Sequence, residues 1–258
     1  EELGLGEADY LEAGQRYLEN FGESARAYER YCQLFLRHPQ QANVETLLTL
    51  ALRERDWPVV EAAGEMFLAD AQGEYTEPYL LGMRSRTMMA RGFRLLKAGR
   101  RAEALALLEA AHDLLPGNGM HADDLFPLLR EHGLLELHDR LFAKSYARIK
   151  EVLAFFPRSA NDKNTAAWLA SRALLQLEEA EKLLSEALAE EPHNPAYLDT
   201  MAEIYFARGE RDKAVAWSAK ALEVERSDAT LRGQNKRFRT APLPKRGGKA
   251  PAPGEAAE

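Results

Sequence analysis

Apolar residues recur along the chain at intervals of three and four, and short polar segments with glycine or proline interrupt them. In the segment that begins at Pro195, for example, Leu198, Met201 and Tyr205 share one face of a helix. No segment of the sequence shows the alternation of β-branched and polar residues that a half-buried strand needs. Leucine, alanine, glutamate and arginine, all good helix formers, dominate the composition. The chain is therefore predicted to be all-α.

A regular spacing of small residues and prolines divides the helical pattern into units. A small residue is followed twelve positions later by proline at Ala27 with Pro39, Ala104 with Pro116, Ser145 with Pro157, and Ala180 with Pro192. The small residue suits a position where a neighbouring helix crosses closely. Proline ends the helix because it lacks the N–H that the hydrogen-bond ladder requires. The pattern predicts a series of similar helical hairpins.

The best-defined unit covers residues 194–224, which read NPAYLDTMAEIYFARGERDKAVAWSAKALEV. Ala180 and Ala214 are 34 residues apart, the period of tetratricopeptide helix-turn-helix units. The segment resembles a tetratricopeptide repeat in its small residues, its aromatic residue and its turn glycine, which are Ala202, Ala214, Ala221, Tyr205 and Gly209. It departs from that pattern in having Leu198 where the family has an early tryptophan and Arg226 where it has the terminating proline.

The resemblance is clearest over residues 161–225 and 86–116. Residues 42–70 and 122–157 have helical hairpin patterns but lack most signature residues, so they are either degenerate repeats or unrelated hairpins. The family implies a right-handed superhelical α-solenoid of about six antiparallel helix hairpins, spanning residues 1–226. The expected hairpins cover about 7–38, 42–70, 77–115, 122–156, 161–191 and 195–225. The basic Pro/Gly-rich tail, 227–258, is expected to form a capping helix at most and to be disordered from about Thr240.

Charge is distributed unevenly along the chain. The net charge is −7, but residues 229–258 carry seven Lys or Arg and two acids, so about −12 remains on the rest. An acidic body repels phosphate backbones, which argues against nucleic-acid or membrane binding by the folded part. The tail is interpreted as a solvated segment able to make weak electrostatic contacts, in preference to a dedicated tether.

The sequence contains no arrangement typical of catalysis or metal binding. The densest group of candidate ligands is His121, Asp123, Asp124, His132, His138 and Asp139, whose spacing matches no metal signature and suits helix starts and turns. The single cysteine, Cys32, lies among apolar helical residues, and His38 at the helix end is the one histidine near it. We therefore expect no cofactor, no metal site and no enzymatic activity.

In the tetratricopeptide family, the first helix of each hairpin lines a concave groove with the face that points away from the second helix. Mapped onto this chain, that face carries Met89, Phe93, Lys97, Lys163, Ala167, Asp199, Glu203 and Phe206. Lys163 with Asn164 fits the clamp that some relatives use for a peptide carboxylate, but Asp199 and Glu203 place negative charge in the next unit. The predicted groove suits a segment with apolar anchors and some basic charge.

The sequence thus predicts a non-catalytic protein–protein interaction scaffold that binds a peptide or protein on its concave face. The alternative is an accessory tetratricopeptide module of a larger enzyme or of a secretion or envelope assembly, with the other domains upstream. The first residue, Glu1, favours a fragment or processed form. Localisation stays open between a cytoplasmic default and a protein whose N-terminal signal or anchor was removed.

Overall fold

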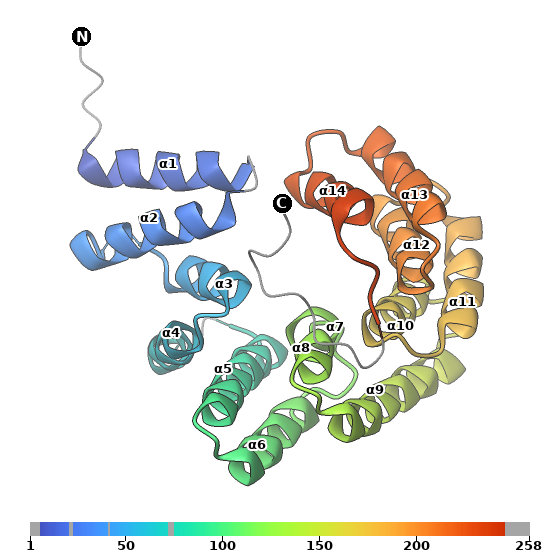
Figure 1. Cartoon of the computed structure of the whole chain (residues 1–258), viewed down its shortest axis with the longest axis horizontal. Coiled ribbons are helices and arrows are strands. Elements are labelled where there is room, and N and C mark those ends of the chain that lie inside the picture. Colours follow the sequence, from blue (N-terminus) through green and yellow to red (C-terminus); the bar gives the residue numbers. More distant parts are fainter. Residues whose placement is uncertain (1–5, 21–22, 41, 72–74, 246–258) are drawn as a thin grey trace. The chain divides into compact units, whose positions relative to one another are not determined.

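The computed structural model describes residues 6–20, 23–40, 42–71 and 75–245. Every regular element within these residues is an α-helix, and within each of the chain's two units successive helices pack against one another (Figure 1). The predicted all-α class with consecutive helix hairpins is confirmed. Most of the tail predicted to be disordered, residues 246–258, lies outside the described residues.

The helices group into two units, Glu1–Leu115 and Pro116–Glu258. In the described part of the first unit the helices are α1 (Glu7–Asn20), α2 (Ser24–Arg37), α3 (Val44–Glu54), α4 (Trp57–Asp70), α5 (Glu77–Lys97) and α6 (Arg101–Asp113). Each of these helices packs against the next one in the chain. Their shared core contains Leu34, Leu48, Leu50, Phe67 and Met83.

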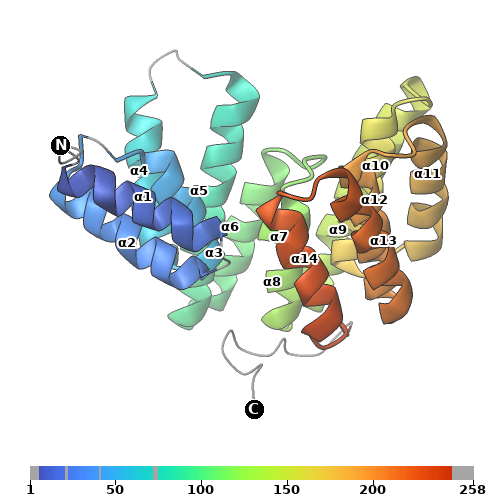
Figure 2. The ribbon, with the colours of Figure 1, turned by 90° about the horizontal axis from the view of Figure 1, so that it is seen from above.

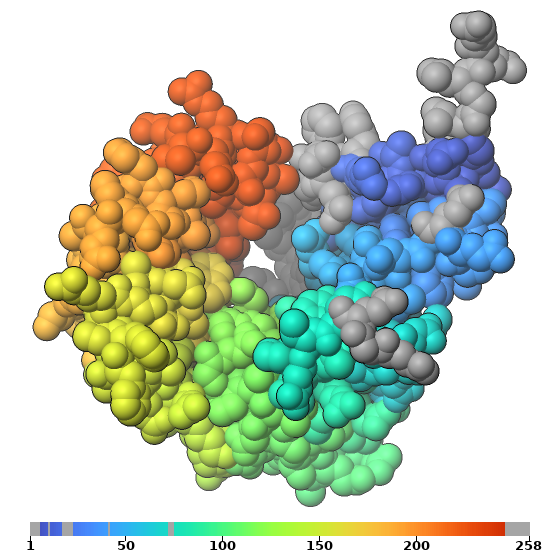
Figure 3. All heavy atoms as spheres, turned by 180° about the vertical axis from the view of Figure 1, so that it is seen from behind, coloured from blue at the N-terminus to red at the C-terminus, as the bar shows by residue number. Residues whose placement is uncertain are grey.

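The second unit contains α7 (His121–Asp124), α8 (Phe126–Glu131), α9 (Leu135–Phe155), α10 (Ala160–Ala173), α11 (Leu177–Glu190), α12 (Pro195–Ala207), α13 (Arg211–Val224) and α14 (Ala229–Thr240). The helix α14 begins in the segment expected to form a capping helix at most. Within each unit, the colours of the space-filling view change gradually from one hairpin to the next (Figure 3). This gradual change reflects that each hairpin packs mainly on its neighbours in sequence.

The spacing of small residues and prolines has a direct structural explanation. The four small residues Ala27, Ala104, Ser145 and Ala180 are all completely buried. The four prolines lie two or three residues after the ends of α2, α6, α9 and α11. Small side chains therefore lie at the helix crossings, and proline comes where each helix ends.

The predicted hairpin over 122–156 differs from the expectation in its first half, which is two short helices instead of one. Pro127 lies in the first turn of α8, and Leu125 before this helix has φ −124° and ψ −59°. Pro127 lacks the N–H that would bond to the carbonyl of Asp123 in a continued helix, and its ring would clash with that carbonyl, so it suits the first turn of a new helix. The helix is therefore interrupted between Asp124 and Phe126. The second half, α9, is a continuous helix of 21 residues.

Two hairpins of the second unit turn in different ways. Between α12 and α13, Gly209 has φ +84°, a conformation that glycine adopts without steric cost. Between α10 and α11, Leu174 and Gln176 have φ values of +59° and +54°. A side chain in this left-handed region costs on the order of 1 kcal/mol, so surrounding contacts must hold the second turn in place.

Gly92 tests the importance of close helix crossing. A Cβ added there would lie 2.8 Å from the side chain of Leu108 on α6. We expect Gly92→Val to lower the free energy of unfolding by about 1–3 kcal/mol because the enlarged side chain overpacks the crossing. The control Ala106→Val adds a similar volume at an exposed position of α6 and should cost no more than about 0.5 kcal/mol. Equal effects of the two substitutions in urea denaturation would contradict the prediction.

Candidate functional site

The last five helices of the second unit are arranged in two rows. Figure 1 shows α10, α12 and α14 on one side, which we call the inner row, and α11 and α13 on the other, the outer row. The inner-row helices contact one another in the order α10, α12, α14. The first helices of the two predicted hairpins, α10 and α12, thus lie side by side, and α14 continues their row (Figure 2).

In the first unit, the structure separates the three predicted contact residues. Met89 and Phe93 are buried, and the Phe93 ring stacks on Trp57 of α4 with centroids 5.1 Å apart. Lys97, at the end of α5, is exposed. Only Lys97 of these three is accessible to a partner in this arrangement.

In the second unit, all five predicted contact residues are buried: Lys163, Ala167, Asp199, Glu203 and Phe206. Lys163 does not face the inner side, because its Nζ lies 3.0 Å from Oε2 of Glu186 on the outer row. Asp199, Glu203 and Phe206 do share one face of α12, at intervals of four and three residues. Burial of this face means that another element already covers it.

The covering element is α14. Arg237 Nη2 donates a hydrogen bond to Oε2 of Glu203, and Phe238 packs on Phe206 with ring centroids 5.2 Å apart. The Arg237 guanidinium also lies 4.9 Å from the Phe206 ring centre, within the range of a cation–π contact. The predicted acidic and apolar face of α12 is therefore occupied by a basic and an aromatic residue of the same chain.

A continuous series of charges links four helices of this unit. Arg172 of α10 donates from Nη1 to Oε1 of Glu203 and from Nε to Oδ1 of Asp123 on α7, both at 3.0 Å. Trp168 Nε1 donates to the second oxygen of Asp123, also at 3.0 Å. The series Asp123, Arg172, Glu203, Arg237 thus alternates in sign from α7 through α10 and α12 to α14.

Glu203 is held ionised within this series. Burial alone would raise its pKa, but the guanidinium groups of Arg172 and Arg237 outweigh that effect and hold the pKa below its ordinary value. A carboxylate with only 2% of its surface exposed depends on such partners. Removing either arginine would leave a buried negative charge poorly compensated.

Asp199, one helical turn before Glu203, has the opposite character. Its Oδ1 is buried and accepts no hydrogen bond. Burial raises the pKa of Asp199 most, and the negative charges of Glu203 and Asp123 raise it further. Arg237 and Arg172 lower it, and the net result is a pKa of about 7. The inner row therefore contains one carboxyl group that changes charge near neutral pH.

Sequence reasoning missed the residues that complete this site, namely Asp123, Arg172, Arg237 and Phe238. A partial signal existed in α14, where Leu231, Asn235 and Phe238 recur at intervals of four and three and form its buried stripe. The pairing of Arg172 with Asp123, 49 residues earlier, has no counterpart in any local pattern.

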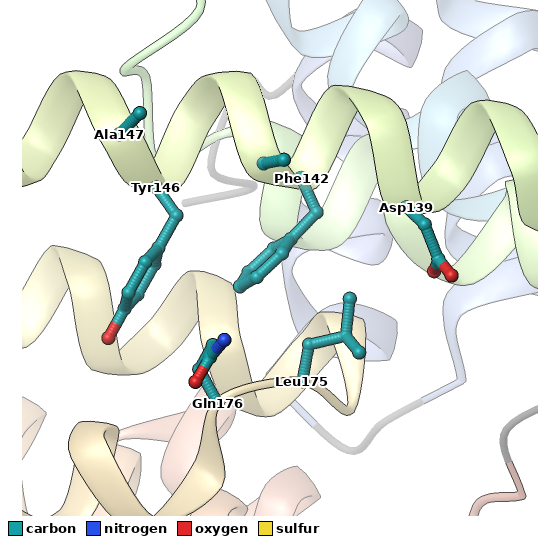
Figure 4. A pocket seen from close by; sticks show the side chains of 7 residues that line it. Asp139, Phe142, Tyr146, Ala147, Leu175 and Gln176 are labelled. Carbon is teal, nitrogen blue, oxygen red and sulfur yellow. The ribbon is translucent and has the colours of Figure 1, made fainter.

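Two other concave regions lie in the second unit. A pocket of about 410 Å³ lies between α9 and the α10–α11 turn, where Phe142 and Tyr146 point towards Leu175 and Gln176 (Figure 4). A second pocket, of about 620 Å³, adjoins the outer row and is lined by Trp217 and Val224, among others. Both are largely apolar surfaces without a cluster of reactive groups.

Within the described residues, no three His, Cys, Asp or Glu side chains come together in a way that could hold a metal ion. None of the helices in this part of the chain is both long and apolar enough to cross a membrane. The chemistry available on the inner row is therefore ion pairing, hydrogen bonding and aromatic packing.

The raised pKa of Asp199 predicts a specific pH dependence of stability. The folded chain keeps the proton up to about pH 7, whereas the unfolded chain loses it near the ordinary value of 3.8, so ionisation favours unfolding between these limits. We expect the free energy of unfolding of the wild type, relative to Asp199→Asn, to fall by on the order of a few kcal/mol between pH 4 and pH 8. Urea denaturation of both proteins across this range measures the difference.

Glu203→Gln provides the control, because a lowered pKa acts in the other direction. Its stabilising contribution is lost as the pH falls through the acidic range. In an Asp199→Asn background, where residue 199 no longer titrates, the effect of Glu203→Gln should therefore stay constant above about pH 5. Parallel curves for Asp199→Asn and wild type would contradict the assignment for Asp199.

Comparisons with known proteins bear on the same part of the chain. Residues 172–233, from the end of α10 into α14, match the model described as "Tetratricopeptide repeat". Among solved structures, the chain is similar to the complex of the TPR2AB domain of yeast Sti1 with pHSP90, at 14% identity and a TM-score of 0.34. That similarity covers 90% of this chain and 98% of the other. No curated protein matches the chain significantly.

The matched segment contains the unit in which the sequence resemblance was clearest, and the resemblance is confirmed there. The repeat assignment of residues 86–116 stays a prediction. Tetratricopeptide hairpins are interaction modules whose stacked surfaces bind proteins or peptides. Residues 172–233 are therefore a segment that matches the tetratricopeptide-repeat family.

Proposed function

We propose that the chain is a non-catalytic scaffold that binds a protein or peptide partner on the inner row of its second unit. The observation that carries the proposal is the repeat segment over 172–233, which contains α12 and the start of α14 in this row. In stacked repeats, the side of the first helices forms an extended concave surface suited to binding. The outer row contributes mainly to the packing of each hairpin.

The accessible groups of the inner side are suited to recognising a mixed polar and apolar segment. Asp123 has about half of its side chain exposed, at 49%. Trp168 is partly exposed beside Asp123, and Arg172 lies 5.7 Å from its ring centre. A partly buried tryptophan with an adjacent ion pair is a common centre of binding energy at protein interfaces.

The eight contact residues expected from sequence have different roles in this proposal. Lys97 is exposed but lies in the first unit, so it is not part of the inner row. Four of the expected contacts are buried in the packing between helices and do not reach a partner: Met89, Phe93, Lys163 and Ala167. The remaining three, Asp199, Glu203 and Phe206, become contacts only if the helix that covers them moves.

The two partly exposed tryptophans of the second unit allow a matched test. Trp168 lies on α10 and Trp217 on α13, so they report on the inner and outer rows respectively. Partners recovered with the tagged wild-type chain are identified by mass spectrometry and quantified against Trp168→Ala and Trp217→Ala. We expect Trp168→Ala to reduce recovery at least tenfold, equivalent to about 1.4 kcal/mol, and Trp217→Ala to leave it unchanged.

Circular dichroism and thermal unfolding establish that both variants stay folded. Asp123→Ala removes the hydrogen-bond acceptor of Trp168 but keeps the tryptophan side chain. It should also reduce partner recovery, as Trp168→Ala does. Loss of partners with Trp217→Ala alone would move the site to the outer-row pocket. Unchanged recovery with all three variants would refute the inner-row proposal.

A further inference from the structure

We infer that the face of α12 beneath α14 is a docking surface for a helical partner segment in which an arginine directly precedes an aromatic residue. In this structure α14 occupies that surface as an intramolecular substitute. The inference rests on the proposed function and names the chemistry of the partner. Its basis is the set of contacts between α14 and α12.

The first step is that α14 supplies what the α12 face lacks. That face presents two carboxyl groups, Asp199 and Glu203, beside the aromatic ring of Phe206. Arg237 pairs with Glu203 while its guanidinium lies 4.9 Å from the Phe206 ring centre, and Phe238 is completely buried against the same ring. Adjacent basic and aromatic residues therefore fit this face in charge and in shape.

The second step concerns how weakly α14 is built. Only three of its twelve residues, Leu231, Asn235 and Phe238, are buried. It carries four basic residues and no acid, so the charges repel one another along the helix, and Gly233 in its middle has low helix propensity. An isolated helix of this length is marginal in water. Its order depends on the Asp228 cap at its N-terminus, on packing against α13, and on the contacts of Arg237 and Phe238 with α12.

The third step is that the junction leaves hydrogen-bonding groups unused. Arg239 Nε donates to Oδ1 of Asn235 at 2.9 Å, and because arginine only donates, this contact fixes which end of the Asn235 amide is the oxygen. The other end, Nδ2, is buried without an acceptor, and Oδ1 of Asp199 is buried without a donor. Each such unsatisfied group lowers the stability of the junction. The packing of α14 on α12 is therefore imperfect, and another helix can compete for the same surface.

The fourth step fixes the orientation of the partner. Arg211 of α13 donates from Nη1 to the backbone oxygen of Phe238 and from Nη2 to that of Ala241. Main-chain carbonyls at a helix C-terminus are present in any helix, so Arg211 can hold the end of a different one. Arg211 thus sets the direction of the docked helix, and Glu203 with Phe206 selects its sequence.

Displacement of α14 also creates the charge that favours a basic replacement. Without α14, Glu203 loses its ion pair with Arg237 and keeps the one with Arg172. Asp199 also loses the nearby positive charge of Arg237. The uncovered face carries two carboxyl groups against one arginine. A partner that lacks an arginine at this position would leave a buried charge uncompensated.

The test uses a fluorescent peptide with the sequence of residues 229–241 and the full-length chain. Arg237→Glu in the chain places a carboxylate opposite Glu203 and releases α14, whereas Lys236→Glu makes the same charge change at an exposed neighbour. We expect Arg237→Glu to bind the peptide at least tenfold more tightly than the wild type or Lys236→Glu, measured by fluorescence anisotropy. A peptide with alanine in place of its Arg–Phe pair should lose this binding.

Equal binding by Arg237→Glu and Lys236→Glu, or equal binding of the alanine peptide, would overturn the inference. If circular dichroism shows that Arg237→Glu has unfolded, Phe238→Ala replaces it with the same expectation. Hydrogen exchange on the wild-type chain needs no variant: a saturating amount of isotope-labelled peptide should accelerate exchange of the α14 amides at least tenfold and leave α13 unchanged. Unaltered α14 exchange would also overturn it.

The peptide experiment and the test of the proposed function can give independent negative results. Loss of partner recovery with Trp168→Ala, together with no peptide binding by Arg237→Glu, leaves the scaffold intact and removes only the docking surface under α14. Peptide binding by Arg237→Glu, together with partner recovery that is unaffected by Trp168→Ala, leaves the peptide-binding surface under α14 intact and removes the inner-row site around Trp168. Full support requires that partners identified with the wild type are recovered in larger amounts with Arg237→Glu than with Lys236→Glu.

Discussion

Close crossing of helices at small side chains is the constraint on which both units depend. Ala27, Ala104, Ser145 and Ala180 have no exposed surface, and Gly92 leaves no room for a Cβ against Leu108. Because each hairpin buries its apolar face chiefly on its neighbours, a crossing that opens at one position weakens the packing of both hairpins it joins. The regular spacing of small residues and prolines follows from this requirement.

The buried carboxylate of Glu203 adds a polar constraint to the second unit. It joins α10 and α14 to α12 through Arg172 and Arg237, and Arg172 extends the connection to α7. Apolar packing alone tolerates small shifts between helices, whereas paired hydrogen bonds to a buried charge require one relative position. The pairing with Arg172 thereby fixes α7 and α10 in register with α12, and the pairing with Arg237 sets the register of α14 while that helix covers the α12 face.

The helix class and the repeat in the second unit could be predicted because both depend on local spacing. The small residues at intervals, the turn glycine Gly209 and the apolar stripe of α12 are all visible in the sequence. The interruption at Pro127 was also encoded locally but was overlooked within a weak hairpin pattern. Accessibility was harder to predict, since it depends on elements distant in sequence. The face of α12 that points away from α13 was expected to be open, and α14 covers it through Arg237 and Phe238.

The turn between α10 and α11 shows how a repeat can acquire a local feature without losing its packing. Leu174 and Gln176 adopt left-handed conformations there, and Gln176, with the intervening Leu175, forms one wall of the pocket opposite Phe142. The backbone strain and the pocket wall therefore have the same origin. A glycine-based turn of the same length, such as that at Gly209, would relieve the strain but would lack the side chains that form the wall. The shape of this pocket is therefore tied to the energetic cost of the turn.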